Sequence, residues 1–234
     1  MNRLRISRFK LPCVGLSALV IALLVFTIDS SAQINATTAR IIDAKKLSLG
    51  SKVTIKGTVT VASGTFRSSF SDYGFQIQDK TSGMYVTVKT DPHLIVGQKV
   101  RLIGKLTETA LKFQIVETDE KGVQVLSGTA HPKPVAIATG KIDEPVIGKL
   151  IRISATVTKP VADVAPYGFR VPVDDGTGEI IAYISTSTSI STKELIPGQH
   201  VELIGVAGQF NHRFQIYPRS PADIKLISTT KTMK

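Results

Sequence analysis

The sequence predicts an all-β protein made of two tandem five-stranded barrels that follow an N-terminal signal or anchor segment. One observation is an internal duplication, because residues 94–115 and 195–216 align without a gap and 11 of the 22 positions are identical. A second is the composition, which is rich in Val, Ile, Thr and Gly and therefore favours strands and turns over helices. Alternating apolar residues inside each copy are a third sign of strands. We therefore expect both copies to fold alike.

The first 32 residues have the pattern of an export signal. Four basic residues precede an uncharged apolar run at 11–28, and the small residues Ser30 and Ala32 come just before the cleavage site expected at Gln33. The run of 18 residues also meets the lower limit for a membrane span, so an uncleaved anchor is the alternative. We expect the remainder to be exported, either periplasmic or extracellular, or membrane-anchored by residues 11–28.

The number of cysteines and the net charge limit the functions that the chain could have. The single cysteine, Cys13, lies in the apolar run, so the exported part has no disulfide, thiolate metal site or cysteine nucleophile. The formal charge is +11, and removing the four basic residues and one acidic residue of the leader leaves +8. A basic surface favours polyanions such as nucleic acid, anionic lipid or acidic glycan, without choosing among them.

The elements of the first copy follow from periodicity and turn residues. A short helix or turn is expected near the start, and a strand begins at Gly50, where Val53 and Ile55 alternate with polar residues. Residues 65–72 are expected to form a loop. Further strands are predicted at 73–79, at 84–89, in the two halves of the duplicated hairpin at 94–115, and at 122–126.

The same series returns after a linker. Prolines and small polar residues predict a linker at 129–134, which separates a domain at 36–128 from a second at 135–228, followed by a disordered tail at 229–234. Gly148 starts a strand that matches the one at Gly50 with an offset of 98. Pro172 is expected to interrupt the next strand. Residues 185–192 are expected to be a flexible polar stretch.

The motifs GxxVxIxGxVT, GFQIQDxTSGMYV, LxVGQxVRLIGKL and FQI resemble those of an OB-fold of the tRNA-anticodon-binding and helicase-wedge kind. The chain is most similar to the OB modules of secreted bacterial nucleases of the YhcR type. The resemblance covers about residues 41–126 and, more weakly, 137–227. It implies ligand binding on strands two and three and on the loops that join strands 1–2 and 4–5.

Strand parity separates core from surface. The residues expected to point inward are Val53, Ile55, Phe75, Ile77, Met84, Val86, Val88, Val100, Leu102, Phe113 and Ile115. Cations interleaved with aromatic rings on the other face are typical of single-strand binding. The predicted nucleic-acid-binding residues are Lys56, Phe66, Arg67, Phe70, Tyr73, Gln76, Gln78, Tyr85, Lys89, Arg101, Lys112, Arg152, Arg170 and Arg213. Tyr73 and Tyr167 fit a barrel-end packing role equally well.

No pattern in the sequence indicates catalysis. The carboxylates lie on different predicted loops, the four histidines lack metal-ligand spacing, and Asp174 and Asp175 fit a turn. We therefore expect no catalytic residue, no metal and no cofactor. The sequence favours an exported, non-enzymatic binding protein for nucleic acid, single-stranded before double-stranded. The alternative is an envelope module that binds protein or glycan, and the membrane is a partner only if the leader is uncleaved.

Overall fold

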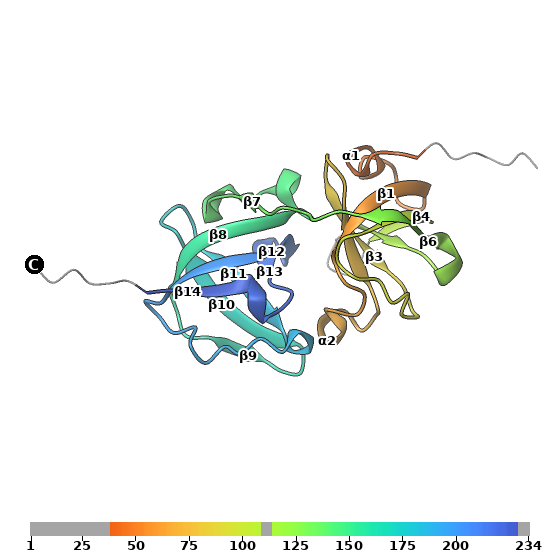
Figure 1. Cartoon of the computed structure of the whole chain (residues 1–234). Coiled ribbons are helices and arrows are strands. Elements are labelled where there is room, and N and C mark those ends of the chain that lie inside the picture. The colour runs from red at the N-terminus through yellow and green to blue at the C-terminus, as the bar shows by residue number, and fades with distance from the viewer. Residues whose placement is uncertain (1–37, 109–113, 229–234) are drawn as a thin grey trace, which may run out of the picture. The chain divides into compact units, whose positions relative to one another are not determined.

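The structure is a computed structural model that describes residues 38–108 and 114–228. These residues belong to one compact unit, which spans residues 36–234. The predicted leader, the predicted binding residue Lys112, the expected core residue Phe113 and the predicted tail lie outside the described residues. The fold is mostly β with few, short helices, as Figure 1 shows. No helix in the described part of the chain is long and apolar enough to cross a membrane.

Five strands close the N-terminal barrel. They pair in the order β1–β2–β3–β5–β4, and β4 returns to β1; only the β3–β5 pairing is parallel. The strands are β1 (Lys52–Val61), β2 (Phe75–Gln78), β3 (Gly83–Thr87), β4 (Gln98–Glu108) and β5 (Gln114–Glu117). This is the five-stranded barrel that the OB-fold resemblance implies. A sixth strand, β6 (Val123–Thr129), pairs with β4, so the predicted strand at 122–126 is confirmed and extends to the start of the predicted linker.

The predicted core of this barrel is confirmed wherever the structure describes the side chains. Residues of alternate parity are buried because successive side chains of a strand point to opposite faces. The buried members of the predicted set are Val53, Ile55, Phe75, Ile77, Met84, Val86, Val88, Val100 and Leu102. The short helix α1 (Ile41–Ala44) covers one end of the core with Ile41 and Ala44. A second short helix, α2 (Arg67–Phe70), lies within the predicted loop at 65–72, and the one-turn η1 (Glu120–Gly122) precedes β6.

The strands of the C-terminal sheet pair in the same order as those of the barrel. The central strands are β8 (Leu150–Val157), β10 (Gly168–Asp174), β11 (Ile180–Ser185), β12 (His200–Phe210) and β13 (Arg213–Tyr217). Again one of the pairings between these five strands, β11 with β13, is parallel. The link between β8 and β10 consists of two residue pairs.

Short elements extend this sheet and connect its strands. At its edges β7 (Val135–Ala136) pairs with β8, β9 (Ala162–Val164) with β10, and β14 (Ile224–Ile227) with β12. The single turns are η2 (Thr139–Lys141), η3 (Glu144–Val146), η4 (Thr186–Thr188) and η5 (Pro221–Asp223).

The expectation that Pro172 interrupts a strand is wrong. Strand β10 runs without a break from Gly168 to Asp174, and Pro172 pairs with Ile181 of β11. On its other edge, β10 pairs with β9 up to Arg170 and with β8 only from Val173 onward. Pro172 falls between these two ladders, at a place where a missing N–H removes no ladder hydrogen bond.

Each half uses an aspartate to fix its leading segment. Asp79 accepts hydrogen bonds from the Ile41 N–H and from Thr81. Asp175 accepts them from Thr139 in the same way. Burial alone would raise the pKa of Asp175, but hydrogen bonds from Thr177 and Thr139 outweigh it and lower the pKa to about 2. The prediction that this aspartate serves a turn is confirmed.

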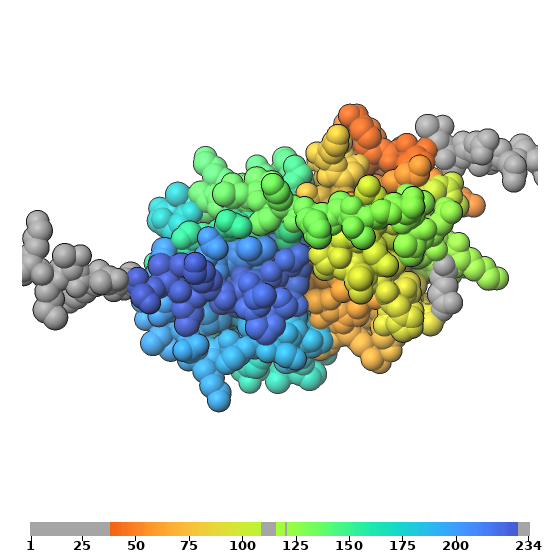
Figure 2. Space-filling view, in the orientation of Figure 1, coloured from red at the N-terminus to blue at the C-terminus, as the bar shows by residue number. Residues whose placement is uncertain are grey.

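The two halves meet through backbone and amide groups. A Cβ on Gly83 would stand 1.8 Å from the carbonyl oxygen of Gly148, so the backbones of these two segments approach as closely as glycine allows. The Gln76 amide donates to the Gly148 carbonyl at 2.9 Å, and the Gln78 side-chain oxygen accepts from the Leu150 N–H at 2.8 Å. Figure 2 shows the atoms of the two halves touching along their boundary. We call this the inter-half contact.

Serines form a second part of the inter-half contact. Ser68 and Ser69 of α2 bond to Ser185, Ser187 and the carbonyl of Tyr167. The stretch at 185–192, expected to be a flexible polar segment, therefore contains the turn η4, and its Ser185 and Ser187 bind the other half. Hydroxyl groups on both sides donate and accept, which suits a contact made of short polar side chains.

Candidate ligand-binding cavities between the two halves

Helix α2 and the residue before it carry two aromatic rings into the space between the halves. Phe66, which precedes the helix, is only 4% exposed and its ring centroid lies 6.0 Å from that of Tyr217. Phe70 is 38% exposed and stands between Tyr85, at 5.1 Å, and Tyr217, at 6.4 Å. Val61 and Val206 complete this cluster, which joins side chains of both halves. Two cavities flank Phe70 and Tyr217, and both residues line both cavities.

The first, which we call the interface cavity, has a volume of about 240 Å³. Its wall is mainly apolar or aromatic, with a few polar groups. Besides Phe70 and Tyr217, it is lined by Lys45, Phe66, Asp72, Gln76, Gly83, Met84, Tyr85, Thr87, Ile147, Gly148, Val206, Ala207, Gly208 and Gln209. A cavity of this composition at the junction of two halves is the usual setting of a ligand site.

Lys45 is the cation of the interface cavity. Burial, and secondarily the neighbouring Lys149, lower the pKa of Lys45 to about 8. Its ammonium donates to the carbonyl oxygen of Ile147 at 2.9 Å, so it reaches from α1 to the other half. An anionic ligand in the cavity would favour the protonated form.

The second, which we call the aromatic cavity, has a volume of about 250 Å³. Rings dominate its wall. It is lined by Ser69, Phe70, Val164, Tyr167, Arg170, Tyr183, Phe210, Gln215 and Tyr217. Tyr167 is 52% exposed, and the Tyr183 and Tyr217 centroids lie 5.6 Å apart.

Strand pairing explains why these side chains converge. Arg170 of β10 lies opposite Tyr183 of β11, and β11 runs parallel to β13, which carries Gln215 and Tyr217 on either side of the core residue Ile216. The four side chains therefore share the outer face of three neighbouring strands. The Arg170 guanidinium lies 5.5 Å from the ring centroid of Phe210, which approaches from the end of β12. That distance is within the range of a cation–π contact.

Two buried polar atoms in this wall have no hydrogen-bond partner among the residues described. They are the side-chain oxygen of Gln215 and the Nε of Arg170. Gln215 is 2% exposed, so solvent cannot readily satisfy it. Buried polar groups are almost always paired, so each of these atoms needs an explanation.

Glycine makes room for the tyrosine rings. A Cβ on Gly208 would stand 2.6 Å from the Tyr217 ring, and one on Gly168 would stand 2.9 Å from the Tyr183 ring. Burial raises the pKa of Tyr217 and of Tyr85, so both phenols remain protonated. The Tyr85 hydroxyl donates to Asp72 at 2.7 Å, which fixes that ring in the wall of the interface cavity.

The structure brings some predicted binding residues together. Those that line the two cavities are Phe66, Phe70, Gln76, Tyr85 and Arg170. The expected exposure of Gln76 is wrong, because the inter-half contact buries it, and the predicted loop residue Phe66 is buried there too. Parity correctly placed Gln76 outside the barrel core, but it could not reveal that the other half covers this face.

Other predicted residues lie elsewhere on the N-terminal barrel. Lys56 and Gln78 line a separate cavity with Lys80 and Lys99, and Arg101 pairs across the strands with Lys56. The Arg67 guanidinium stacks 4.5 Å from the ring centroid of Tyr73. Lys89 is exposed. Whether these side chains bind nucleic acid stays a prediction.

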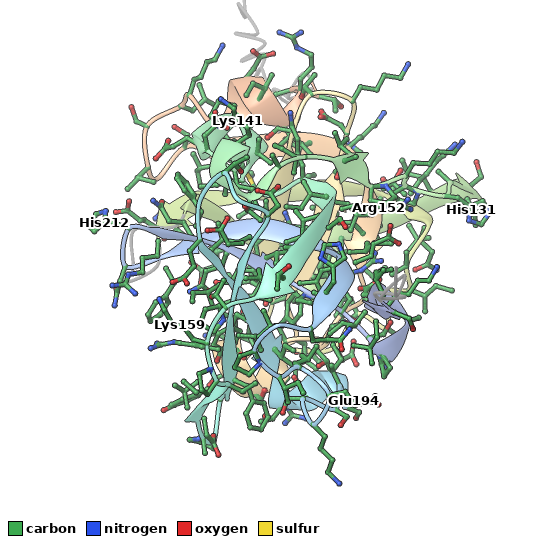
Figure 3. All side chains as sticks on the ribbon, turned by 90° about the vertical axis from the view of Figure 1, so that its left-hand side faces the viewer. His131, Lys141, Arg152, Lys159, Glu194 and His212 are labelled. Atoms are coloured by element: carbon green, nitrogen blue, oxygen red, sulfur yellow. The ribbon has the colours of Figure 1, made fainter. Side chains whose placement is uncertain are left out.

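The last two predicted arginines are exposed on the C-terminal sheet. Arg152 lies 4.0 Å from Glu202, and Arg213 lines a further cavity with Lys159 and His212. In Figure 3, Arg152 lies on a different side of the sheet from Lys159 and His212. These arginines therefore belong to separate surfaces.

Sequence reasoning missed most of the aromatic cavity. Tyr183 occupies the position in β11 that Tyr85 occupies in β3, since each lies opposite the residue that directly follows the Gly-Phe pair of its own half. Tyr217 and Gln215 have outward parity in β13. Duplication and parity together could have pointed to these three residues, whereas Phe210 and Lys45 carry no such signal.

Metal binding finds no support in the described ranges, where no three His, Cys, Asp or Glu side chains are grouped to hold an ion. The polar groups of the cavities instead suit hydrogen bonding and anion binding.

No protein-family model matches the chain, and no curated protein matches it. Among solved structures, the chain is similar to fission yeast Pot1 with ssDNA, at a TM-score of 0.40 and 10% identity over 83% of this chain and 90% of that one. It is similar to a murine DNA binding protein bound with ds DNA, at a TM-score of 0.37 and 13% identity over 77% of this chain and 98% of that one.

It is also similar to a Replication Protein A heterotrimer bound to ssDNA, at a TM-score of 0.26 and 19% identity. That match covers 33% of this chain and 57% of that chain. Because these TM-scores are low, the fold assignment depends on the strand pairing described above.

Proposed function

We propose that the chain is a tandem OB-fold protein that binds single-stranded nucleic acid in the aromatic cavity and the adjoining interface cavity. The C-terminal sheet acts as the second barrel of the pair. The observation that carries the proposal is the aromatic cavity itself. There, Phe70, Tyr167, Tyr183, Phe210 and Tyr217 surround one opening beside the guanidinium of Arg170.

Single-stranded nucleic acid is the partner that suits this wall. The bases of a single strand are free to leave the stack and lie on aromatic faces, at about 1–3 kcal/mol per base. A duplex keeps its bases inside, so its ring faces cannot reach a cavity lined by tyrosines without prior opening. Arg170 and Lys45 supply positive charge beside the rings, and the chain beyond the leader has a net charge of +8, that is, +11 less the leader's three.

The location of the protein outside the cytoplasm is also part of the proposal. The charged start, apolar run and small residues of the leader support export, with anchoring by residues 11–28 as the alternative. The proposed activity is binding and not catalysis, since rings, amides and cations suit stacking and hydrogen bonding, and the carboxylate of the interface cavity, Asp72, accepts a hydrogen bond from Tyr85. A relationship to nuclease-attached OB modules remains part of the same proposal.

Fluorescence anisotropy with a labelled oligo(dT) of about 15 nucleotides tests the proposal. Binding should weaken steeply as salt rises, because cations on the protein release counterions from the strand. Phe70→Ala and Tyr167→Ala should each weaken binding roughly tenfold, since each removes a stacking face. Ile95→Ala is the matched control, because Ile95 is exposed and lines none of the cavities described.

An envelope protein or glycan is the alternative partner, because ring faces beside an amide also suit other flat or apolar groups. Oligo(dT) that fails to bind at low salt, together with salt-independent binding of a neutral oligosaccharide, would favour that alternative.

A further inference from the structure

Resting on the proposed function, we infer that the aromatic cavity takes one unstacked guanine base and that Gln215 and Arg170 read its edge. Aromatic stacking alone tolerates any base. The inference therefore adds base selectivity to the site and assigns it to two side chains.

Gln215 carries the first part of the inference. Its neighbour Ile216 points into the core of the C-terminal sheet, so Gln215 points to the outer face, into the wall of the aromatic cavity. The residue is 2% exposed and its side-chain oxygen has no partner in the described part of the chain. An unpaired buried acceptor costs about 1–3 kcal/mol, and a hydrophobic residue would avoid that cost. A donor on the ligand explains why the cavity holds a glutamine.

Arg170 carries the second part. Its Nε–H is also buried without a partner in the described residues, while its guanidinium lies against the Phe210 ring. Contact with the ring orients the planar group and leaves its N–H donors for a ligand. The cavity therefore presents arginine donors and a glutamine acceptor within one ring-lined wall.

Guanine fits this pair of groups better than the other bases. It presents two adjacent acceptors, O6 and N7, to the fork of an arginine. Its N1–H and N2–H₂ groups lie on the neighbouring edge and can donate to the Gln215 oxygen. Adenine offers a donor next to its N7, and cytosine and thymine have no N7 acceptor. Cytosine has two adjacent acceptors, N3 and O2, but only one donor group beside them, and the two acceptors of thymine are separated by its N3–H. Guanine alone joins two adjacent acceptors, for the arginine, to two adjacent donors, for the glutamine.

The cavity has room for one base. Its volume of about 250 Å³ is below the roughly 300–1,000 Å³ of pockets that hold drug-sized ligands. Tyr183 and Tyr217 supply the ring faces, and Phe70 of α2 closes the side toward the interface cavity. A base that enters here must leave the stack of its strand, which single-stranded nucleic acid permits at small cost.

The test compares oligo(dT) with the same oligonucleotide carrying one central dG, dA or dC, by anisotropy at constant salt. A single guanine in a thymine background also avoids strands that fold on themselves. We expect the dG oligonucleotide to bind roughly tenfold more tightly than the other three. Gln215→Leu should abolish this preference, retain oligo(dT) binding and raise the melting temperature, because the unpaired acceptor is gone.

Thr54→Val is the matched control for Gln215→Leu. Thr54 is also 2% exposed and its hydroxyl also lacks a partner in the described residues, but it lies in β1 of the N-terminal barrel and lines none of the cavities described. Its replacement should raise the melting temperature and leave the dG preference unchanged. Arg170→Lys provides a second variant, which keeps the charge and should lose the preference because the fork is gone.

The outcomes separate the inference from the proposed function. Equal affinity for all four oligonucleotides, a preference for dA or dC, or a dG preference that survives Gln215→Leu and Arg170→Lys would overturn the inference and leave single-strand binding intact. Failure of every oligonucleotide to bind at low salt would overturn the proposed function as well.

Discussion

Lys45 lies in the wall of the interface cavity, where burial lowers the pKa of its ammonium group to about 8 from 10.5. A phosphate placed nearby would favour the protonated form and raise this pKa again. Binding near pH 8 should therefore take up a proton, and affinity should fall as the pH rises past the pKa. A group that titrates in this range would make the proposed oligonucleotide binding sensitive to mild alkali.

We predict that oligo(dT) affinity falls several-fold between about pH 7 and pH 9. Lys45→Met should bind more weakly at pH 7 and show a flatter pH profile, because no ammonium is left to deprotonate. Lys193→Met is the control, since Lys193 is exposed and lines none of the cavities described. A profile that stays steep in Lys45→Met would assign the titration to another group.

The different burial of two phenylalanines shows a limit of prediction from the sequence alone. Phe66 and Phe70 stand four residues apart in a segment without strand periodicity, and nothing in the sequence separates them. The structure buries Phe66 against Tyr217 and leaves Phe70 in the walls of both cavities. Burial of a loop aromatic depends on what lies across from it, and that neighbour is more than a hundred residues away in the chain.

At the scale of elements, two glycines set how closely β3 approaches the turn before β8. A Cβ on Gly83 would stand 1.8 Å from the Gly148 oxygen, and one on Gly148 would stand 2.3 Å from the Gly83 oxygen. Gly148 also has a φ of +88°, in the left-handed region that disfavours other residues. Strand and turn can therefore meet here only through glycine.

We predict that Gly83→Ala destabilises the protein by about 1–3 kcal/mol, measured by urea unfolding, because the methyl group forces the two segments apart. Gly148→Ala should cost more, since it adds backbone strain to the clash. Gly176→Ala separates the two effects, because Gly176 has a φ of +94° but nothing within 4 Å of its Cβ position. Equal losses for Gly148→Ala and Gly176→Ala would show that the inter-half contact does not depend on this approach.

The strands were predictable because side-chain alternation is a local property. Parity identified nine buried core residues of the N-terminal barrel but not the buried Thr54, Thr60 or Gln76, and the turn at Asp175 followed from residue type. The continuous strand through Pro172 was not predictable, because tolerance of proline depends on which neighbouring strand lies beside it. Burial of Gln76 was not predictable either, because strand parity places its side chain outside the barrel core but does not show that the other half covers this face of β2.

At the scale of the whole molecule, Arg219 ties the end of the chain to the N-terminal barrel. Its guanidinium forms two 2.8 Å bonds with the Asp223 carboxylate and donates at 2.8 Å to the carbonyl oxygen of Thr60. Both charged side chains are mostly buried. A planar fork that meets a carboxylate and a carbonyl together cannot be replaced by a lysine.

We predict that Arg219→Lys lowers the free energy of unfolding by about 1–3 kcal/mol, because the carboxylate and the carbonyl lose paired donors. Arg213→Lys should change it by less than about 0.5 kcal/mol, since Arg213 is exposed. Thermal unfolding of both variants checks this. If they melt alike, the bond to Thr60 contributes little to holding the halves together.

The outer face of the second and third barrel strands differs between the duplicated halves. In the N-terminal barrel, Gln76 and Gln78 of β2 form the inter-half contact, and Tyr85 of β3 lines the interface cavity. In the C-terminal sheet, the matching face of β10 and β11 carries Arg170 and Tyr183 and borders a cavity. We therefore assign base stacking in the aromatic cavity mainly to the second copy with α2 of the first, while the first copy supplies much of the wall of the interface cavity.

Tyrosine emission tests this assignment most directly. The chain has no tryptophan and five tyrosines, and four of them, Tyr85, Tyr167, Tyr183 and Tyr217, line the two cavities. Titration with unlabelled oligo(dT), corrected for its absorption, should quench most of this emission along the same saturation curve as the anisotropy. An oligonucleotide that binds by anisotropy yet leaves tyrosine emission unchanged would contradict the account, because the strand would then lie away from the cavities.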